Sequence, residues 1–221
     1  MNSIYFDYAA STPLDKEVLA RMEPYFYSKF GNPGSIHSFG QEAIAAVDLA
    51  RETISKAIGA DFREIIFTGS ATEANNLALR GTLKVFQNSI VKNSRLIVSS
   101  IEHESVLETA RVLESEGIDV IYLPVSSDGF INLEDFKNAL NEQTILVSVM
   151  YANNEIGTIQ PIQEISKIIA DFKKEHKTSY PFFHTDAVQA FQYLNCDVND
   201  LGVDLMTLSA HKIYGPKGIG A

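Results

Sequence analysis

From about Gln41 onward, short runs rich in β-branched residues alternate with longer segments of helical periodicity. Parallel strands need long crossover connections, which helices usually provide, so the alternation predicts a mostly parallel sheet covered by helices on both faces. We therefore expect an α/β fold with three layers. The predicted strands are Ile65–Phe67, Leu96–Ser99, Val120–Leu123, Ile145–Val149, Phe182–Thr185 and Asp204–Leu208. The predicted helices are Ser38–Ile58, Glu73–Val85, Ser105–Glu116, Leu133–Leu140 and Ile162–Lys177.

Composition and charge exclude several kinds of partner. With 221 residues, of which 45% are hydrophobic, the chain can bury a sizeable core. Its net charge of −10 would repel a phosphate backbone and an anionic membrane surface, so we expect no direct nucleic-acid partner. The longest apolar runs, such as Ile145–Met150, are far shorter than the roughly 20 residues that cross a bilayer. We expect no membrane span.

Cysteine usage and the N-terminus indicate the compartment. The single cysteine, Cys196, excludes a disulfide framework within one chain and any cysteine-based zinc or iron-sulfur site. The N-terminus places Asp7 where a signal peptide needs its apolar stretch and has no Arg-rich amphipathic character. We therefore expect an unprocessed cytoplasmic protein, and we assign no metal ligands.

The last residues bear on completeness. Ile219–Ala221 reads as the start of an apolar strand immediately after a glycine-rich turn. Because a domain rarely stops where a strand begins, we expect that the chain is truncated.

A phosphate-binding segment is predicted between the first expected strand and the next helix. In open α/β sheets, ligands bind beyond the carboxyl ends of the strands. Thr68–Asn76 follows such an end and is rich in small and hydroxyl residues. Small residues let the backbone approach an anion, and the free N–H groups and the Thr72 hydroxyl at a helix N-terminus can donate to phosphate oxygens. A plain capped helix start is the alternative.

A lysine follows the last expected strand. Lys212 lies in Ser209–Gly218, among Ser, His and a Gly-Pro turn. A solvated surface charge is the usual role of a lone lysine. An amine that attacks a carbonyl must be neutral, and at a reference pKa of about 10.4 roughly one lysine in a few thousand is neutral at pH 7. A burying or cationic site would be needed to lower that pKa.

Three further strand ends carry polar residues. Asp186 ends an apolar run and is either a cap or a buried carboxylate that faces a cationic ring nitrogen. Two weaker clusters, Glu102–Glu104 and Asn153–Gly157, follow the expected strands Leu96–Ser99 and Ile145–Val149. A histidine near a helix start is more often a satisfied polar residue than a catalyst, and Asn-Asn before Gly is common in turns.

These segments occur in the order found in class V aminotransferases, which are pyridoxal-phosphate enzymes of fold type I. More closely, the chain resembles cysteine desulfurases of the NifS/IscS type. The resemblance covers the whole chain and includes Tyr5–Thr12, Phe30–His37, Ala71–Glu73, Glu102–His103, Asn153–Gly157, His184–Gln189, Ser209–Lys212 and Gly215–Gly218. It implies an aspartate-aminotransferase-like large domain.

The resemblance also implies residue roles. Lys212 would bind pyridoxal phosphate covalently and then shuttle a proton, and Asp186 would keep the ring nitrogen protonated. His103 would stack on the ring and exchange protons with the substrate. Asn154 and Gln189 would hold the ring hydroxyl side. The phosphate would be held by Ala71, Thr72, Ser209 and His211.

The implied activity is conversion of L-cysteine to L-alanine, with sulfur transferred through an enzyme persulfide for iron-sulfur cluster assembly or tRNA thiolation. The implied partners are a second copy of the full-length chain and an iron-sulfur scaffold or sulfur-acceptor protein. The implied domains are an N-terminal arm, residues 1–14, and a large domain, residues 15–221, without the small C-terminal domain.

The chain departs from the family pattern in its second half. The family's catalytic cysteine, its substrate-carboxylate arginine and its small domain are not in this sequence. Cys196 lies in a different context, and we expect it to be a structural thiol. Two other interpretations stay open: another class V enzyme, such as a selenocysteine lyase or an aminotransferase, or a non-catalytic truncated subunit that pairs with others.

Overall fold

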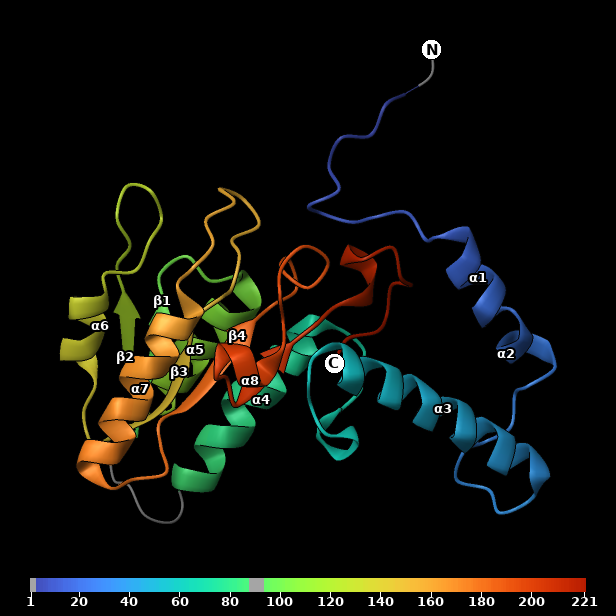
Figure 1. The fold of residues 1–221 in the computed structure, drawn as a ribbon, viewed down its shortest axis with the longest axis horizontal. Coiled ribbons are helices and arrows are strands. Elements are labelled where there is room, and N and C mark those ends of the chain that lie inside the picture. Colours follow the sequence, from blue (N-terminus) through green and yellow to red (C-terminus); the bar gives the residue numbers. More distant parts are fainter. Residues whose placement is uncertain (1–2, 88–93) are drawn as a thin grey trace.

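The computed structural model describes residues 3–87 and 94–221. Five parallel strands form a sheet in the order β2-β1-β3-β4-β5 (Figure 1). The strands are β1 (Arg95–Ser99), β2 (Asp119–Leu123), β3 (Thr144–Ser148), β4 (Phe182–Asp186) and β5 (Leu205–Thr207). Each lies on a predicted strand, and the ends differ by one residue, which is within the normal disagreement about element boundaries.

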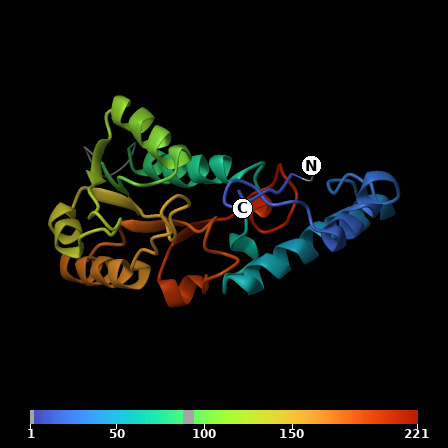
Figure 2. The same cartoon turned by 90° about the horizontal axis from the view of Figure 1, so that it is seen from above.

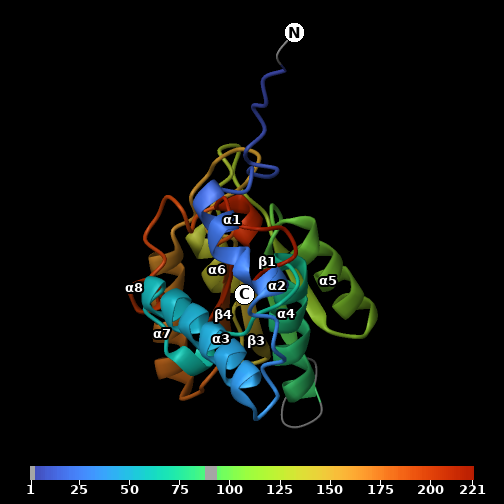
Figure 3. The ribbon, with the colours of Figure 1, turned by 90° about the vertical axis from the view of Figure 1, so that its right-hand side faces the viewer.

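Helices cover both faces of the sheet, which confirms the three-layer α/β class (Figure 2). The helices are α1 (Lys16–Met22), α2 (Pro24–Tyr27), α3 (Ser38–Ala57), α4 (Ala71–Gln87), α5 (Glu104–Ser115), α6 (Leu133–Ala139), α7 (Ile162–His176) and α8 (Val198–Leu201), with short 3₁₀ turns η1 (Phe62–Glu64) and η2 (Ala210–Lys212). Helices α4 and α5 lie on one side of the sheet, and α6, α7 and α8 on the other (Figure 3).

Side-chain alternation along the strands creates two cores. Leu96 and Val98 of β1 pack with Leu79 of α4 on one face, whereas Ile97, between them, packs with Phe136 of α6 on the other. Successive residues of a strand point to opposite faces, so a central strand that is buried on both sides is apolar throughout. The continuous apolar runs of the sequence are explained by this double burial.

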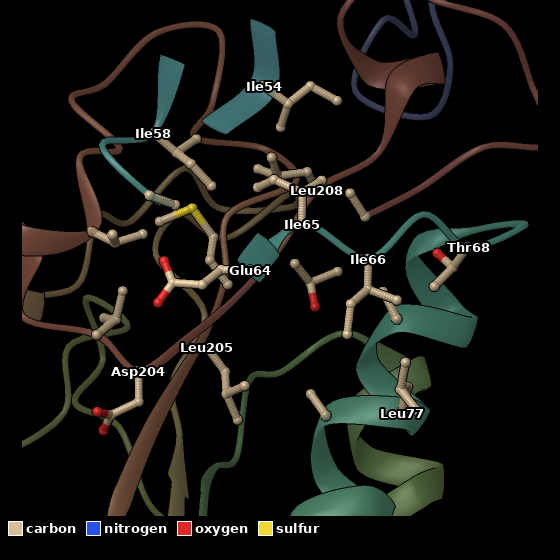
Figure 4. A pocket seen from close by; sticks show the side chains of 18 of the residues that line it. Ile54, Ile58, Glu64, Ile65, Ile66, Thr68, Leu77, Asp204, Leu205 and Leu208 are labelled. Carbon is tan, nitrogen blue, oxygen red and sulfur yellow. The ribbon is translucent and has the colours of Figure 1, made fainter. Parts of the chain in front are cut away.

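The predicted strand Ile65–Phe67 does not form. Of this region only Thr68 makes a bridge, an antiparallel one to Gly220, which also bridges Ser209. An apolar cavity of about 730 Å³ separates Ile65 and Ile66 from Leu205 of β5 (Figure 4). A strand needs a hydrogen-bonded backbone neighbour, and among the described residues this region has one only at Thr68, which pairs with Gly220; the adjoining Ala221 pairs with Leu208 instead.

Helices α1 and α2 and most of α3 extend away from the sheet (Figures 1 and 3). Helices α1 and α2 bury no residue, and the 20-residue α3 buries only Gly40, Ala43 and Ser55. Phe26, Phe30, Ile36 and Phe39 of this extension are each more than half exposed. In the ranges that the structure describes, no helix is both long and apolar enough to cross a membrane.

Candidate active site

The strand order places a crevice between the ends of β1 and β3. Strands β1 and β3 are neighbours in the sheet. Strand β2 lies on the outer side of β1, whereas β4 and β5 follow on the outer side of β3, so the sheet grows in opposite directions from this pair. Such a reversal of direction is where open α/β sheets bind ligands. His103 follows β1 and Asn154 follows β3, so these two predicted site residues lie on either side of the reversal. Asp186 and Lys212 follow at the ends of β4 and β5.

Asp186, the last residue of β4, is a buried carboxylate with defined partners. It is 6% exposed; its Oδ2 accepts a hydrogen bond from Asn75 Nδ2 at 2.8 Å and its Oδ1 accepts one from the Val188 N–H at 3.0 Å. Burial raises the pKa of Asp186, while these two hydrogen bonds and the charges of His103 and Lys212 act against that rise. The carboxylate is thus a fixed hydrogen-bond acceptor that favours a cation beside it.

Lys212 lies in η2, immediately beyond β5. The pKa of its amine is lowered, mainly because the amine is partly buried. The carboxylates of Asp7 and Asp186 oppose this change. The amine donates to the carbonyl oxygens of Ala9 and, at 3.0 Å, of Ala10. A lowered pKa increases the fraction of neutral amine, which is the nucleophilic form.

The N-terminal segment closes over this side of the site. Gln189 Nε2 donates to the Ala9 carbonyl at 2.9 Å, and the Thr12 hydroxyl donates to the His211 carbonyl at 2.9 Å. The sequence placed Gln189 beside a cofactor ring, whereas its amide contacts the protein's own backbone here. Residues 9–12 therefore contact three residues of the candidate site, Gln189, His211 and Lys212, a contact that the sequence analysis did not predict.

The start of α4 is both a capped helix start and a possible phosphate-binding site, the two roles considered for it. Ser70 caps the helix, because its Oγ accepts from the Glu73 N–H at 3.1 Å. The amides of Ala71 and Thr72 belong to the first turn, where the helix itself provides no acceptor. A plain cap is thus present, and two donors remain available for an anion.

Ser209 and His211 lie beside this helix start. They line one shallow cavity together with Ser70 and Lys217. Gly220 passes so close that a Cβ there would be 2.7 Å from the Ala71 nitrogen. Burial and the charges of Lys212 and Lys217 lower the pKa of His211, which favours the neutral form of its ring.

His103 caps α5 with its own ring. Its Nδ1 accepts from the Ser105 N–H at 3.1 Å, and the Ser105 hydroxyl lies 2.8 Å from the same nitrogen. The Ser105 hydroxyl in turn lies 2.9 Å from Asn75 Nδ2. The usual polar role considered for His103 is therefore met, and the same ring also borders the crevice.

One cavity joins the predicted site residues. It contains all of them except Ser209, which is next to it, and is lined by Ser70, Ala71, Thr72, His103, Ser105, Met150, Asn154, Asp186, Val188, Gln189, His211 and Lys212. The larger apolar cavity of Figure 4 carries none of the predicted site residues. The polar cavity is therefore the candidate active site.

Three buried polar residues in and beside the site were given no role in the sequence analysis. Asn75 is fully buried on the same stripe of α4 as Leu79 and Leu83, and a polar residue on an apolar stripe was an available signal. Glu102 was named only as part of the weak polar cluster Glu102–Glu104 and of the segment Glu102–His103, and Ser105 only as the first residue of a predicted helix. Glu102 Oε1 accepts from the Ser99 hydroxyl at 2.5 Å and from the Met150 N–H at 2.6 Å, which ties the end of β1 to the end of β3.

Cys196 does not have the lowered pKa that activates a nucleophilic cysteine. Its thiol is free, and burial raises its pKa to about 11. It packs with Ile58, Ala187 and Leu208 rather than lining the polar cavity. In the described ranges no group of three or more His, Cys, Asp or Glu could hold a metal ion.

Comparison with known proteins places the chain in a family. The aminotransferase class-V family matches residues 4–221. The chain belongs to the aminotransferase class-V family. Members of this family depend on pyridoxal phosphate.

Relatives of this class V chain share a name and a fold. It is 50% identical over 218 residues to "Cysteine desulfurase IscS" of Dictyoglomus turgidum and 51% identical over 219 residues to the protein of that name from Rickettsia massiliae. Each match covers 99% of this chain but only 53% and 51% of the relative, so the chain spans about half the length of these relatives.

Two solved structures are close matches to this class V fold. "SspA in complex with cysteine" has a TM-score of 0.90 and 43% identity, covering 99% of this chain and 60% of that one. "NIFS-LIKE PROTEIN" has a TM-score of 0.91 and 40% identity, with coverages of 98% and 57%.

The residues of the polar cavity fit the family's cofactor. A buried carboxylate for a ring nitrogen, a lysine of lowered pKa for an aldehyde and a helix N-terminus for a phosphate all border one space. The backbone of Gly220 also passes where a side chain would collide with the helix start. This donor set suits pyridoxal phosphate, whose three polar groups have these needs.

Proposed function

We propose that this chain is the pyridoxal-phosphate-binding half of a cysteine desulfurase. The enzyme would convert L-cysteine to L-alanine and pass the sulfur to a thiol acceptor as a persulfide, for iron-sulfur cluster assembly or tRNA thiolation. One observation carries the proposal: Lys212, Asp186 and His103 meet in one cavity at the reversal of strand order, in a chain about half identical to relatives named cysteine desulfurase.

Each cavity residue has a task that its surroundings favour. Lys212, with its lowered pKa, would bind the cofactor covalently and later carry a proton. Asp186, held by Asn75 and Val188, would accept a hydrogen bond from the ring nitrogen and keep it protonated. When bound, the cofactor supplies an electron sink for the pair that develops at the substrate Cα.

The remaining residues would bind and orient. His103 would face the ring and exchange a proton with the substrate, and Asn154 and Gln189 would fix the ring plane. The phosphate would lie at the amides of Ala71 and Thr72, with Ser209 and His211 beside it. We further propose residues 1–14 as an arm and residues 15–221 as the large domain.

Partners and location are part of the same proposal. The extension of α2 and α3 exposes Phe26, Phe30, Ile36 and Phe39, and exposed apolar clusters of this kind mark interfaces. A homodimer of the full-length protein is the expected assembly, with an iron-sulfur scaffold or another sulfur acceptor as its partner. A free, buried thiol suits a reducing cytoplasm.

Reductive trapping tests cofactor binding at Lys212. The purified chain is incubated with pyridoxal phosphate and reduced with borohydride, and the modified lysine is mapped by mass spectrometry. We expect one pyridoxyl adduct, on Lys212, that is lost when the chain is denatured first. The neighbouring Lys217 should stay unmodified because it is exposed to solvent and does not line the polar cavity.

The controls separate a site from random labelling. A Lys212→Ala chain should give no adduct, whereas a Lys217→Ala chain should label as the parent does. Labelling that is spread over many lysines, or that persists in the Lys212→Ala chain, would contradict the site. For the gene product with both halves, alanine as the product of cysteine supports the proposed reaction, and a keto acid contradicts it.

A further inference from the structure

Two side chains connect His103 to Asp186. The amide nitrogen of Asn75 lies 2.8 Å from Asp186 Oδ2 and 2.9 Å from the Ser105 hydroxyl oxygen. That hydroxyl lies 2.8 Å from His103 Nδ1. Asn75 is fully buried and Ser105 is 8% exposed, so water does not compete easily for these contacts.

The direction of each hydrogen bond follows from the chemistry of the groups. Both oxygens of Asp186 accept, one of them from Asn75, so the group of Asn75 that faces them must be the NH₂. An NH₂ group only donates, and therefore the Ser105 oxygen accepts from Asn75. The single hydroxyl hydrogen of Ser105 is then left to donate to His103 Nδ1.

His103 Nδ1 receives a second donor. The Ser105 N–H points at the same nitrogen at 3.1 Å as the cap of α5. A nitrogen that accepts two hydrogen bonds carries a lone pair, so in neutral imidazole the proton must be on Nε2. The tautomer of His103 is thus defined by its surroundings on one side of the ring.

We propose that Asn75 and Ser105 are positioning residues that hold His103 as the Nε2–H tautomer while they hold Asp186 as an acceptor. The proposal builds on the function proposed above, where His103 and Asp186 face the same cofactor ring. It means that His103 meets the reactants with a proton donor rather than with a free lone pair. The two ends of the site are then oriented by one chain of hydrogen bonds.

Nitrogen NMR of the histidine rings tests the proposal without cofactor or turnover. In the ¹⁵N-labelled chain at about pH 8, above the reference histidine pKa of about 6.5, long-range nitrogen–proton correlations separate the two neutral tautomers. We expect the His103 signals, assigned with a His103→Gln variant, to show a protonated Nε2 and an unprotonated Nδ1.

Variants of Ser105 and Asn75 should shift the tautomer ratio. Ser105→Ala removes one of the two donors to Nδ1, and Asn75→Ala frees the hydroxyl to turn and accept instead. At the usual net worth of one hydrogen bond, each should lower the ratio of Nε2–H to Nδ1–H by about 2- to 10-fold. Ser105→Thr, which keeps the hydroxyl, should restore the parent ratio.

The controls distinguish positioning from folding. Thr109→Val removes another buried hydroxyl, one turn further along α5, whose partner is the Ser105 carbonyl, and should leave the His103 ratio unchanged. The His184 signals, from a ring buried between Ser148 and Thr207, report whether the sheet is intact in each variant.

Two results would overturn the proposal: an Nδ1–H majority in the parent chain, or a parent-like ratio in Ser105→Ala with intact His184 signals. Because these spectra need no pyridoxal phosphate, such a failure is distinct from a failure of the proposed function, which would appear as absent labelling of Lys212.

Discussion

At the scale of single residues, Glu102 and His184 are two ionisable groups that are buried without a counter-charge. Burial raises the pKa of Glu102 to about 8, opposed by the hydrogen bonds from Ser99 and Met150. Burial lowers the pKa of His184 to about 3. Glu102 Oε2 has no hydrogen-bond partner among the described residues, which fits a neutral carboxyl group that carries its proton there. Both side chains are therefore uncharged near neutral pH.

The stability of the protein should fall between about pH 6.5 and 8 because of Glu102. Over that range the folded state keeps a proton that the unfolded state, with a pKa near 4.5, has lost. Unfolding therefore becomes easier as the pH rises, by up to about 1.4 kcal/mol per pH unit. His184 acts in the opposite sense, but only between about pH 3 and 6.5, where the unfolded state binds the extra proton.

Urea unfolding of a Glu102→Gln variant measures this contribution. The amide keeps an oxygen for Ser99 and Met150 but cannot ionise, so the decline between pH 6.5 and 8 should flatten. Glu155→Gln, at an exposed position, is the control and should keep the parent slope. A parent-like decline in Glu102→Gln would show that Glu102 is not the group responsible.

At the scale of elements, α4 holds the site by its first turn, and its glycine in the middle is a weak point. A Cβ on Gly81 would have its nearest neighbour at 4.0 Å, so there is room for alanine. Gly81→Ala should stabilise the protein by about 0.4–1 kcal/mol through better helix propensity and a less flexible unfolded chain. The midpoint of thermal unfolding should rise, with labelling of Lys212 unchanged.

Gly220→Ala is the contrasting change, at a glycine outside α4 that lies against the start of this helix. Its Cβ would lie 2.5 Å from the Ser70 carbonyl carbon, so the start of α4 must move. We expect a lower unfolding midpoint and weaker labelling of Lys212. Equal effects of the two alanine substitutions would contradict this account of how α4 is placed.

Much of the fold could be predicted from the sequence because local signals agreed with it. Strands β1, β3 and β4 are buried on both faces, and such strands are continuously apolar whichever elements cover them. Their apolar runs could therefore be recognised in the sequence without knowing which elements pack against them. Ile65–Phe67 has the same local pattern, yet its pairing depends on a neighbouring strand that the pattern cannot report. Most of the residues proposed for the cofactor share one cavity because they follow the ends of β1, β3, β4 and β5, whereas their roles stay predictions from the family resemblance.

The hydrogen bonds between residues of the site could not be predicted. Asn75 and Ser105 lie 30 residues apart, and their contact depends on how α4 packs against α5. Similarly, Gln189 was expected beside a ring, but its contact with Ala9 spans 180 residues of sequence. Long-range hydrogen bonds of this kind follow from the packing of elements, which residue patterns do not encode.

At the scale of the whole molecule, the apolar extension of α2 and α3 should make the chain self-associate. Phe26 is 68% exposed and Ile36 is 94% exposed. Changing both to Ser should lower the average mass measured by sedimentation at a fixed concentration. Tyr193→Ser, at an exposed aromatic residue outside this extension, should not change it. An unaltered mass in the double variant would contradict the assignment of this surface as an interface.

The contact between Lys212 and the carbonyls of Ala9 and Ala10 also has a kinetic consequence. Two carbonyl acceptors favour the charged form of the amine, which has no lone pair to attack an aldehyde, so residues 9–10 must release the amine before its neutral form reacts. Capture of the cofactor then becomes a gated process. Its rate should rise with cofactor concentration only until release of the amine limits it, and the plateau would measure how often the N-terminal segment opens.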